Sequence, residues 1–262
     1  MAKQNVLITG TSSGIGASFA VFLAEKDYHV ILTARREEKL RDIHQLIISR
    51  GGTASIFVSD LSDEASRINL FNEITQSVGQ VDMLINNAGF GWYGYYTDMP
   101  WPLAREIEEV NIRAVTHLTS LFLPAMRKRE DGHIINIGSI SGGLPNQGIA
   151  MYSATKAFLD AFTTALYREL HGSGVSASVM RLGPVQTEFY NAARRRENGR
   201  SIPAERFAIP TARVNQALWR LIRKPRRVIY VPAWMAGSKY LEILFAPIID
   251  LLGPLLLKRR ND

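Results

Sequence analysis

The sequence predicts a doubly wound α/β fold, a single domain of about seven parallel strands flanked by helices. Short apolar runs rich in β-branched residues alternate along the chain with stretches of helical spacing. The runs lack a polar face, as strands of a parallel sheet do when right-handed crossovers lay helices on both of its sides. No repeat, low-complexity tract or linker divides the 262 residues. Residues 1–262 are therefore expected to form one domain.

The strands and helices can be placed in order along the chain. Strands are expected at Val6–Thr9, Val30–Ala34, Ile56–Ser59, Met83–Asn86, Ile134–Ile137, Val175–Leu182 and Val228–Val231. Helices are expected at Ile15–Asp27, Glu37–Arg50, Asp63–Val78, Pro102–Lys128, Tyr152–His171 and Thr211–Arg223. The polar segment 190–210 has few apolar anchors and is expected to be irregular, either a loop that covers a substrate or a plain surface connection.

The composition narrows the classes of protein and of site. Without cysteine the chain has no disulfide, thiolate nucleophile or cysteine-ligated metal, and a reducing cytoplasm is the expected compartment. The formal net charge of +7 comes from scattered basic residues without a nucleic-acid-binding motif, so no nucleic-acid partner is expected. The N-terminus runs into a strand without the pattern of an export signal. No metal site is expected, because no close ligand pair occurs among His29, His44, His117, His133 and His171.

A glycine-rich turn follows the first expected strand and opens the first expected helix. It reads Thr9-Gly10-Thr11-Ser12-Ser13-Gly14-Ile15-Gly16. Glycine permits a tight turn and the close approach of backbone to a pyrophosphate, while a helix N-terminus offers free N–H groups and a partial positive charge to the anion. The turn predicts a dinucleotide site of the Rossmann type, with contacts from Gly10, Ser12, Ser13, Gly14, Ile15 and Gly16.

Two arginines end the second expected strand, in the sequence Thr33-Ala34-Arg35-Arg36. A dinucleotide fold that selects NAD usually places an acidic residue there, which binds the adenosine ribose. Here no carboxylate repels a 2′-phosphate, and the guanidinium of Arg35 can present a planar fork of donors to it. NADP(H) is therefore the expected cofactor. The alternative is that the two arginines only begin a solvent-exposed helix.

Tyr152 and Lys156 stand four residues apart in a helical segment, so both side chains project from one face. An ammonium at about 4 Å supplies at most about 4 kcal/mol of attraction to a phenolate at an effective dielectric of about 20. Half of this attraction would lower the pKa of Tyr152 by more than about one unit. Tyr152 can then exchange a proton with a substrate oxygen. Ser139, at the end of the fifth expected strand, can hydrogen-bond to the same oxygen.

Further segments occur in a fixed order around these residues. They are Asp60 after the third expected strand, Asn86-Asn87-Ala88-Gly89 after the fourth, Asn111, Tyr152-Ser153-Ala154-Thr155-Lys156, and Gly183-Pro184-Val185-Gln186-Thr187 after the sixth. With the TGxxxGxG turn and the YxxxK spacing, about residues 5 to 232 resemble the short-chain dehydrogenase/reductase family. The sequence departs from the family pattern at Leu182-Gly183-Pro184, where Pro-Gly is commoner, which bears on the local nicotinamide contact.

The resemblance implies roles for these residues. Tyr152 would act as general acid and base, Lys156 would lower its pKa and bind the nicotinamide ribose, and Ser139 would orient the substrate oxygen. Asn111 would hold a water that links Lys156 to solvent. The resemblance also implies a homodimer or homotetramer through the helices beginning near residues 102 and 152. The remaining implied cofactor contacts are Asp60 and Leu61 at the adenine, then Asn87, Ala88, Gly89, Pro184, Val185 and Thr187. Asp60 has an alternative reading as a helix cap.

Two apolar regions bear on the substrate and on partners. Aromatic residues are dense between Phe90 and Trp101, which indicates either a bulky apolar substrate or packing of this loop onto the following helix. The C-terminal extension 236–262 is apolar from Tyr240 through Leu257 and then basic at Lys258-Arg259-Arg260. Its charges, glycine and proline make it a poor transmembrane span. It is expected to line a substrate pocket, to lie in a subunit interface or to rest on a membrane surface.

The sequence therefore predicts an NADP(H)-dependent oxidoreductase that transfers hydride between nicotinamide and a carbonyl or secondary alcohol. A lipophilic ketone or aldehyde is the expected substrate. The alternatives are a non-catalytic NADP(H)-binding regulatory protein and a protein that binds a membrane surface.

Overall fold

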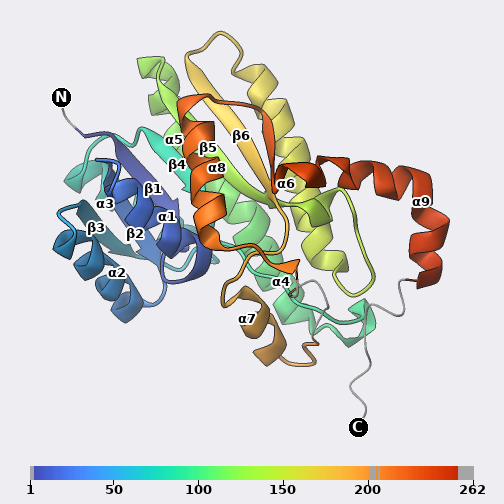
Figure 1. Cartoon of the computed structure of the whole chain (residues 1–262). Helices are drawn as coiled ribbons and strands as arrows, with labels where there is room; N and C mark the ends of the chain where they lie inside the picture. Colours follow the sequence, from blue (N-terminus) through green and yellow to red (C-terminus); the bar gives the residue numbers. More distant parts are fainter. Residues whose placement is uncertain (1–2, 201–204, 206, 253–262) are drawn as a thin grey trace.

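The structure is a computed structural model that describes residues 3–200, 205 and 207–252. Within them, parallel strands form one seven-stranded sheet in the order β3-β2-β1-β4-β5-β6-β7 (Figure 1). The strands are β1 (Asn5–Thr9), β2 (His29–Ala34), β3 (Thr53–Val58), β4 (Met83–Asn86), β5 (Gly132–Ser139), β6 (Val175–Leu182) and β7 (Val228–Val231). The predicted doubly wound α/β class is confirmed.

The strand order reverses beside β1. This strand pairs with β2 on one side and with β4 on the other, so that Ile8 lies level with Leu32 and with Ile85. In open α/β sheets such a switch point leaves a crevice at the carboxyl ends of the strands, where ligands bind. The segments that follow β1, β4 and β5 therefore meet at one edge of the sheet.

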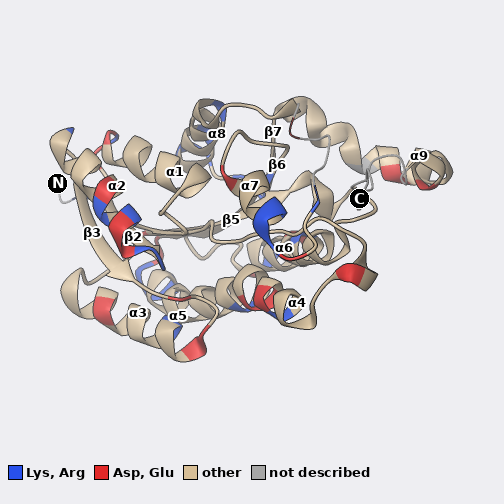
Figure 2. Cartoon of the chain, turned by 90° about the horizontal axis from the view of Figure 1, so that it is seen from below, with Lys and Arg blue, Asp and Glu red and all other residues tan. Residues whose placement is uncertain are grey.

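Helices cover both faces of the sheet, as the view in Figure 2 shows. One face carries α1 (Gly14–Ala24), α2 (Glu37–Ser49) and α8 (Thr211–Arg223), and the other carries α3 (Glu64–Ser77), α5 (Ala114–Arg129) and α6 (Ala150–Glu169). Successive strand side chains point to opposite faces, so Ile8 packs in the core beneath α1 and Leu7 in the core beneath α5. Both faces are covered, which explains why the strand sequences lack a polar face.

All seven predicted strands are present; β1 and β2 begin one residue earlier than predicted, and the bounds of β3 and β5 differ by more. β3 begins at Thr53, three residues before the expected start at Ile56, because this edge strand is only half-buried and its first residues carry no apolar signal. β5 extends beyond the expected apolar run at both ends, and all of its residues are buried. Its polar His133 is accommodated by a hydrogen bond of 2.8 Å to the hydroxyl of Ser178 on β6.

The long helix expected over Pro102–Lys128 is divided in the structure. α4 (Trp101–Glu108) is followed by a π-helical turn, Glu109–Arg113, and then by α5. A π-helical turn inserts one extra residue into a helix that otherwise continues, so hydrophobic spacing does not reveal it. Such turns are frequent at functional sites, and this one contains Asn111.

Two helices lie in segments without a helical prediction. α7 (Phe189–Arg195) occupies the start of the segment 190–210, so the expectation of an irregular chain is wrong for these residues. With seven residues, α7 is too short to show a helical period in the sequence. α9 (Ser238–Leu252) forms most of the described part of the extension 236–262, whose residues 253–262 lie outside the described part of the chain. No helix in the described residues is long and apolar enough to cross a membrane.

Candidate active site

The turn after β1 wraps around the N-terminus of α1. Gly10 and Gly14 have φ angles of +72° and +58°, in the left-handed region that glycine adopts without strain. A Cβ atom on Gly16 would lie 2.3 Å from the carbonyl oxygen of Gly10, so a larger residue would force the turn open. Ser13, at the start of α1, makes no capping hydrogen bond, and the first turn of the helix holds no acidic residue. The N–H groups of this helix terminus are therefore available to an anion.

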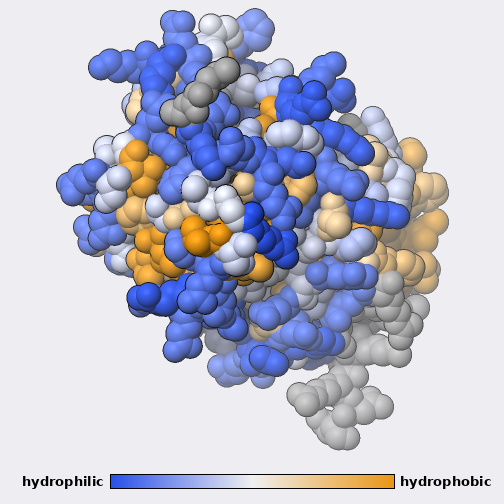
Figure 3. Space-filling model, turned by 60° about the vertical axis from the view of Figure 1, so that its left-hand side comes forward, coloured by the Kyte–Doolittle hydropathy of each residue, from blue (hydrophilic) through white to orange (hydrophobic). Residues whose placement is uncertain are grey.

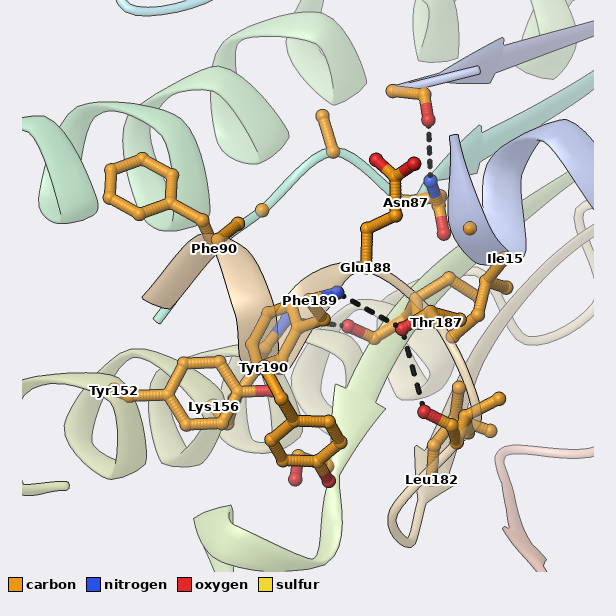
Figure 4. Close-up of a pocket in the computed structure, with 18 of the residues that line it drawn as sticks. Ile15, Asn87, Phe90, Tyr152, Lys156, Leu182, Thr187, Glu188, Phe189 and Tyr190 are labelled. Carbon is orange, nitrogen blue, oxygen red and sulfur yellow. Dashed lines mark hydrogen bonds between the residues drawn. The ribbon is translucent and has the colours of Figure 1, made fainter. Parts of the chain in front are cut away.

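Hydrogen bonds tie the segment after β4 to this turn. The amide Nδ2 of Asn87 donates to the carbonyl oxygen of Thr9 at 2.8 Å. The hydroxyl of Thr9 accepts from the backbone N–H groups of Asn87 and Ala88 at 3.0 and 2.9 Å. In Figure 4, Asn87 and Ile15 mark the end of the pocket formed by these two segments. Thr9, which the sequence analysis did not single out, thus holds together two segments expected to bind the cofactor.

A cavity of about 720 Å³ follows the carboxyl edge of the sheet from the phosphate turn to α7. Among the residues expected at the site, only Gly16 and Asn111 do not line it; both are buried behind its wall. The expected residues that line it are Gly10, Ser12, Ser13, Gly14, Ile15, Arg35, Asp60, Leu61, Asn87, Ala88, Gly89, Ser139, Tyr152, Lys156, Pro184, Val185 and Thr187.

Arg35 and Arg36 stand together beside the phosphate turn. Nη2 of Arg36 donates to the hydroxyl of Ser13 at 2.8 Å. Nη1 of Arg35 instead lies 3.4 Å from Oε1 of Glu106 and 3.8 Å from Oδ2 of Asp60. Both arginine side chains are about half exposed and both line the cavity. Arg36 contacts the turn directly but was not predicted as a cofactor contact, because its only sequence signal is its place beside Arg35.

Tyr152, Lys156 and Ser139 converge on the cavity from α6 and from the end of β5. The hydroxyl of Ser139 lies beside Tyr152 and acts to lower the pKa of this tyrosine. Nζ of Lys156 lies 5.6 Å from the centre of the Tyr152 ring and donates to the carbonyl oxygen of Ile137 at 2.8 Å. The hydroxyl of Ser139 also accepts from the N–H of Ser141 at 3.1 Å, which fixes its place at the end of the strand.

Burial sets the proton affinities of this group. It raises the pKa of Tyr152 to about 12, and the hydroxyl of Ser139 opposes the rise. Burial also lowers the pKa of Lys156 to about 8, and the negative charge of Asp160 opposes this fall. Removing a phenolate from water disfavours the charged form, and this effect dominates in the chain by itself. The expectation that Lys156 lowers the pKa of Tyr152 stays a prediction.

A buried acidic residue that the sequence analysis missed stands one helical turn beyond Lys156. Oδ1 of Asp160 pairs with Nε of Arg181 at 2.9 Å, and Arg181 also contacts the hydroxyl and the ring of Tyr230 on β7. Oδ2 of Asp160 is buried and has no hydrogen-bond partner among the described residues. A Cβ atom on Gly142 would lie 2.8 Å from this oxygen, so the glycine leaves room for the carboxylate. Asp160 thus supplies negative charge behind the ammonium of Lys156.

The side chain of Asn111 is used for structural contacts. It is 1% exposed, and its Nδ2 donates to the carbonyl oxygen of Phe90 at 2.9 Å and to the hydroxyl of Thr155 at 3.1 Å. Its Oδ1 accepts from the N–H of Phe90 at 3.1 Å. These bonds tie the chain after Gly89 to α6. The implied role of Asn111 in holding a water stays a prediction.

An aromatic wall closes the cavity beside Tyr152. Tyr93 stacks on Tyr190 with ring centres 6.0 Å apart. The ring centre of Phe189 lies 5.6 Å from that of Tyr152, and Figure 4 shows these two rings side by side with Tyr190. Phe189 and Tyr190 both belong to α7. Tyr190 lies in the segment 190–210, for which a loop over the substrate was one expectation, whereas Phe189 was not singled out. Further lining residues that no sequence motif indicated include Val110, Leu144, Asn146, Gln147, Ile149 and Glu188.

Both interpretations of the aromatic segment after β4 apply in part. Phe90 and Tyr93 line the cavity, whereas Trp92 is buried against Leu103 and Ile107 of α4.

The structure bears on one of the three expected roles of the C-terminal extension, that of lining a substrate pocket. None of the described residues of the extension, 236–252, lines the cavity. A role in the pocket is therefore wrong for this part of the extension.

The residues present fit a dinucleotide that carries a further phosphate. The uncapped N-terminus of α1 and the glycine turn suit a pyrophosphate. The guanidinium groups of Arg35 and Arg36 stand beside that turn, where a phosphate on the adenosine ribose can accept hydrogen bonds from them. Lys156 lies at the other end of the same cavity.

Known proteins match most of this chain. The family model described as short chain dehydrogenase matches residues 4–198. An uncharacterised oxidoreductase of Bacillus subtilis is 32% identical over 207 residues, which cover 78% of this chain and 72% of that protein. The very-long-chain 3-oxoacyl-CoA reductase of Laccaria bicolor is 33% identical over 174 residues, which cover 65% of this chain and 51% of that protein.

Solved structures match the fold over nearly the whole chain. A short-chain dehydrogenase from Sphingobium yanoikuyae in complex with NADPH has a TM-score of 0.82 and 25% identity, covering 99% of this chain and 98% of that one. A metagenomic short-chain oxidoreductase in complex with NADP has a TM-score of 0.74 and 30% identity, covering 87% of this chain and 94% of that one.

Proposed function

The chain belongs to the short-chain dehydrogenase family, and we propose that it is an NADP(H)-dependent oxidoreductase that transfers hydride between the nicotinamide and a carbonyl or secondary alcohol. The observation that carries the proposal is that Tyr152, Lys156 and Ser139 line the same cavity as the glycine-rich phosphate turn. Fold alone does not fix an activity. A phenol, an ammonium and a hydroxyl at one end of a dinucleotide cavity do support carbonyl chemistry.

NADP(H) is the cofactor that this cavity supports best. The N-terminus of α1 would hold the pyrophosphate, and Arg35 and Arg36 would hold the 2′-phosphate. When bound, the cofactor supplies or accepts the hydride. The chain's other proposed contacts with it are Asp60 and Leu61 at the adenine, Asn87, Ala88 and Gly89 along the middle, and Lys156, Pro184, Val185 and Thr187 at the nicotinamide end.

The chain's own residues handle the proton. In the reducing direction Tyr152 donates its hydroxyl proton to the substrate oxygen, and a pKa of about 12 keeps the phenol protonated at neutral pH. Ser139 donates a hydrogen bond to the same oxygen and so orients the carbonyl. The ammonium of Lys156 stabilises the phenolate that remains after proton transfer. Asn111 supports the relay through which Tyr152 regains its proton.

We expect the substrate to be a lipophilic ketone, aldehyde or secondary alcohol. Near Tyr152 the cavity is lined by Tyr93, Leu144, Ile149, Phe189 and Tyr190. Binding of an apolar substrate against these side chains is favoured by about 25 cal/mol for each Å² of apolar surface removed from water. Polar groups reach the cavity at Ser139, Asn146 and Gln147, which suits a substrate with one or two polar atoms on an apolar body.

The test is the oxidation of NADPH against a panel of ketones and aldehydes, with NADH in parallel. Tyr152→Phe should lose at least about 100-fold in kcat/KM, because proton transfer by a positioned acid contributes this much. It should still bind NADPH. Tyr167→Phe on the same helix, at a side chain 37% exposed, is the matched control and should keep full activity. Tight NADPH binding without turnover of any compound would favour the regulatory protein instead.

We further propose a homodimer or homotetramer in the cytoplasm. The outer surface of α6 exposes the aromatic rings of Phe158 and Tyr167, and Phe158 stacks on Phe162 with ring centres 6.0 Å apart. Apolar rings exposed on a long helix are suited to burial against a second copy. The absence of cysteine suits a reducing compartment.

A further inference from the structure

α9 carries apolar side chains on its outward side. It continues from the short helix Ala233–Gly237 and projects from the body of the protein (Figure 1). Leu241 and Leu244 are three residues apart, as are Ile248 and Leu251, so each pair lies along one side of its half of the helix, before and after a bend at Phe245. Their exposed fractions are 47%, 67%, 53% and 77%.

The other side of α9 is less exposed. Glu242, Ala246 and Ile249, again three or four residues apart, are less exposed than their neighbours. A helix on a soluble protein normally turns its apolar side to the core and its charged side to water. α9 instead leaves several leucines and isoleucines in water while Glu242 is half-buried, which indicates that the helix has an apolar partner.

Apolar surface extends to the residues before the helix. Trp234 is 76% exposed, and tryptophan is enriched at the boundary between lipid and water. In Figure 3 hydrophobic surface gathers at the right-hand edge, where α9 lies, as well as on the left and near the middle of the visible face. The adjacent Met235 lies against Gly183, which lines the cavity, so the exposed apolar surface begins beside the proposed active site.

The described part of the helix is too short and too bent to cross a bilayer. Its 15 residues span about 22 Å, against a hydrocarbon core of about 30 Å. Phe245 departs from helical geometry with φ −128° and ψ 16°, and Pro247 follows within the helix. A segment of this kind can lie in the plane of the interface with its apolar side among the acyl chains.

We propose that α9 docks this protein on the surface of a lipid bilayer that contains anionic lipids. The sequence after α9 continues with Leu255-Leu256-Leu257 and then Lys258-Arg259-Arg260, and the whole chain carries a net charge of +7. Clusters of basic residues beside an apolar anchor are attracted to anionic headgroups. Docking would bring the cavity close to the phase in which lipophilic carbonyl compounds dissolve. The docking itself does not depend on the proposed enzymatic activity.

A lipid surface fits α9 better than a second copy of the chain does. Two helices pair along straight seams of interlocking side chains. The bend at Phe245 and Pro247 divides the apolar side of α9 into two short pieces. A fluid acyl layer adapts to such a bend, whereas a rigid partner helix does not.

Flotation with vesicles tests the proposal on the full-length protein. Wild type is mixed with phosphatidylcholine vesicles, with and without phosphatidylglycerol, and is compared with the double variant Leu244→Glu, Ile248→Glu. The control is Ile48→Glu, which places the same charge at a side chain 48% exposed on α2. For each variant, NADPH binding is measured as a check on folding, and light scattering without lipid reports the oligomeric state.

Wild type and Ile48→Glu should float with the anionic vesicles, and the double variant should bind them at least about tenfold more weakly. Binding of wild type should also weaken when phosphatidylglycerol is left out or salt is added. Failure of wild type to float, or equal flotation of the double variant, would overturn the proposal. The proposal would also be overturned if wild type formed an oligomer without lipid and the double variant did not, because α9 would then be a subunit interface. Loss of turnover with flotation intact would count only against the enzymatic proposal.

Discussion

At the scale of single residues, the charged form of Lys156 lowers the stability of the fold but is needed for the proposed reaction. Its pKa is lowered to about 8 from the usual 10.5, because the ammonium is removed from water. A lowered lysine pKa opposes folding below about pH 8, and this opposition disappears as the pH rises from about 8 towards 10.5. The proposed reaction needs the charged ammonium of Lys156. Activity should therefore decline over the same pH range in which loss of this charge makes folding more favourable.

The rate of carbonyl reduction is therefore expected to fall as the pH rises through about 8. Asp160→Asn should move the midpoint of this fall to lower pH, because the Asp160 carboxylate raises the pKa of Lys156. The measurement is kcat/KM against pH. Asp82→Asn removes another buried carboxylate, one that accepts from the N–H of Asn5 at 2.7 Å at the start of β4. It should lower stability and leave the midpoint in place. A midpoint shared by wild type and Asp160→Asn would contradict the electrostatic role of Asp160.

The two arginines beside the phosphate turn can be separated by their effect on cofactor choice. Arg35→Ala should raise the Kd of NADPH by about tenfold or more, since a hydrogen bond to a charged group contributes about 1.5–3 kcal/mol. NADH binding should stay unchanged, because NADH lacks the 2′-phosphate. Arg36→Ala is the matched comparison, and binding is measured by fluorescence titration. If only Arg36→Ala lost affinity for NADPH, the prediction for Arg35 would be wrong and Arg36 would be the residue that binds the 2′-phosphate.

At the scale of elements, polar contacts hold α7 and the residues after it over the cavity. Nη1 of Arg196 lies 2.8 Å from Oε2 of Glu106 on α4, and the Arg196 guanidinium lies 3.9 Å from the centre of the Phe90 ring. The indole Nε1 of Trp92 donates to the carbonyl oxygen of Glu197 at 2.8 Å. These contacts join the segment after β6 to the segment after β4, far apart in sequence.

Glu106→Gln should loosen this contact and expose the chain at α7. Trypsin is expected to cleave after Arg194 and Arg195 severalfold faster, because local opening becomes easier when a polar contact is weakened. The KM for bulky substrates should change more than the KM for small ones. Glu25→Gln is the control, since it disrupts an ion pair of 2.6 Å with Arg50 away from the cavity. Equal cleavage of both variants would show that Glu106 does not hold α7.

At the scale of the whole molecule, the exposed aromatic rings on α6 bear on the state of assembly. Phe158→Asp should convert the proposed dimer or tetramer to smaller species in light scattering, because a charge buried in an apolar interface is costly. Ile68→Asp on α3, at a side chain 40% exposed, is the matched control and should leave the assembly unchanged. A wild-type protein that is monomeric at working concentrations would contradict the proposed oligomer.

The sequence by itself determined the sheet, most helices and the two ends of the site. Strand runs and helical spacing are local patterns, and the glycine turn and the Tyr152 to Lys156 spacing are fixed by neighbouring residues. Sequence motifs and the family resemblance could therefore identify many of the residues that line the cavity, although not Ala34, Arg36 or Ser59.

Only the tertiary structure decided what depends on packing between distant segments. Phe189 and Tyr190 join the aromatic wall because α7 folds back beside Tyr93, and Asp160 meets Arg181 because α6 packs against β6. The raised pKa of Tyr152 likewise depends on burial, which no spacing of charges along the chain reveals. The exposure of apolar residues on α9 also became known only from the tertiary structure. A sequence pattern shows which residues share a side of a helix, but not whether that side packs on the protein or faces water.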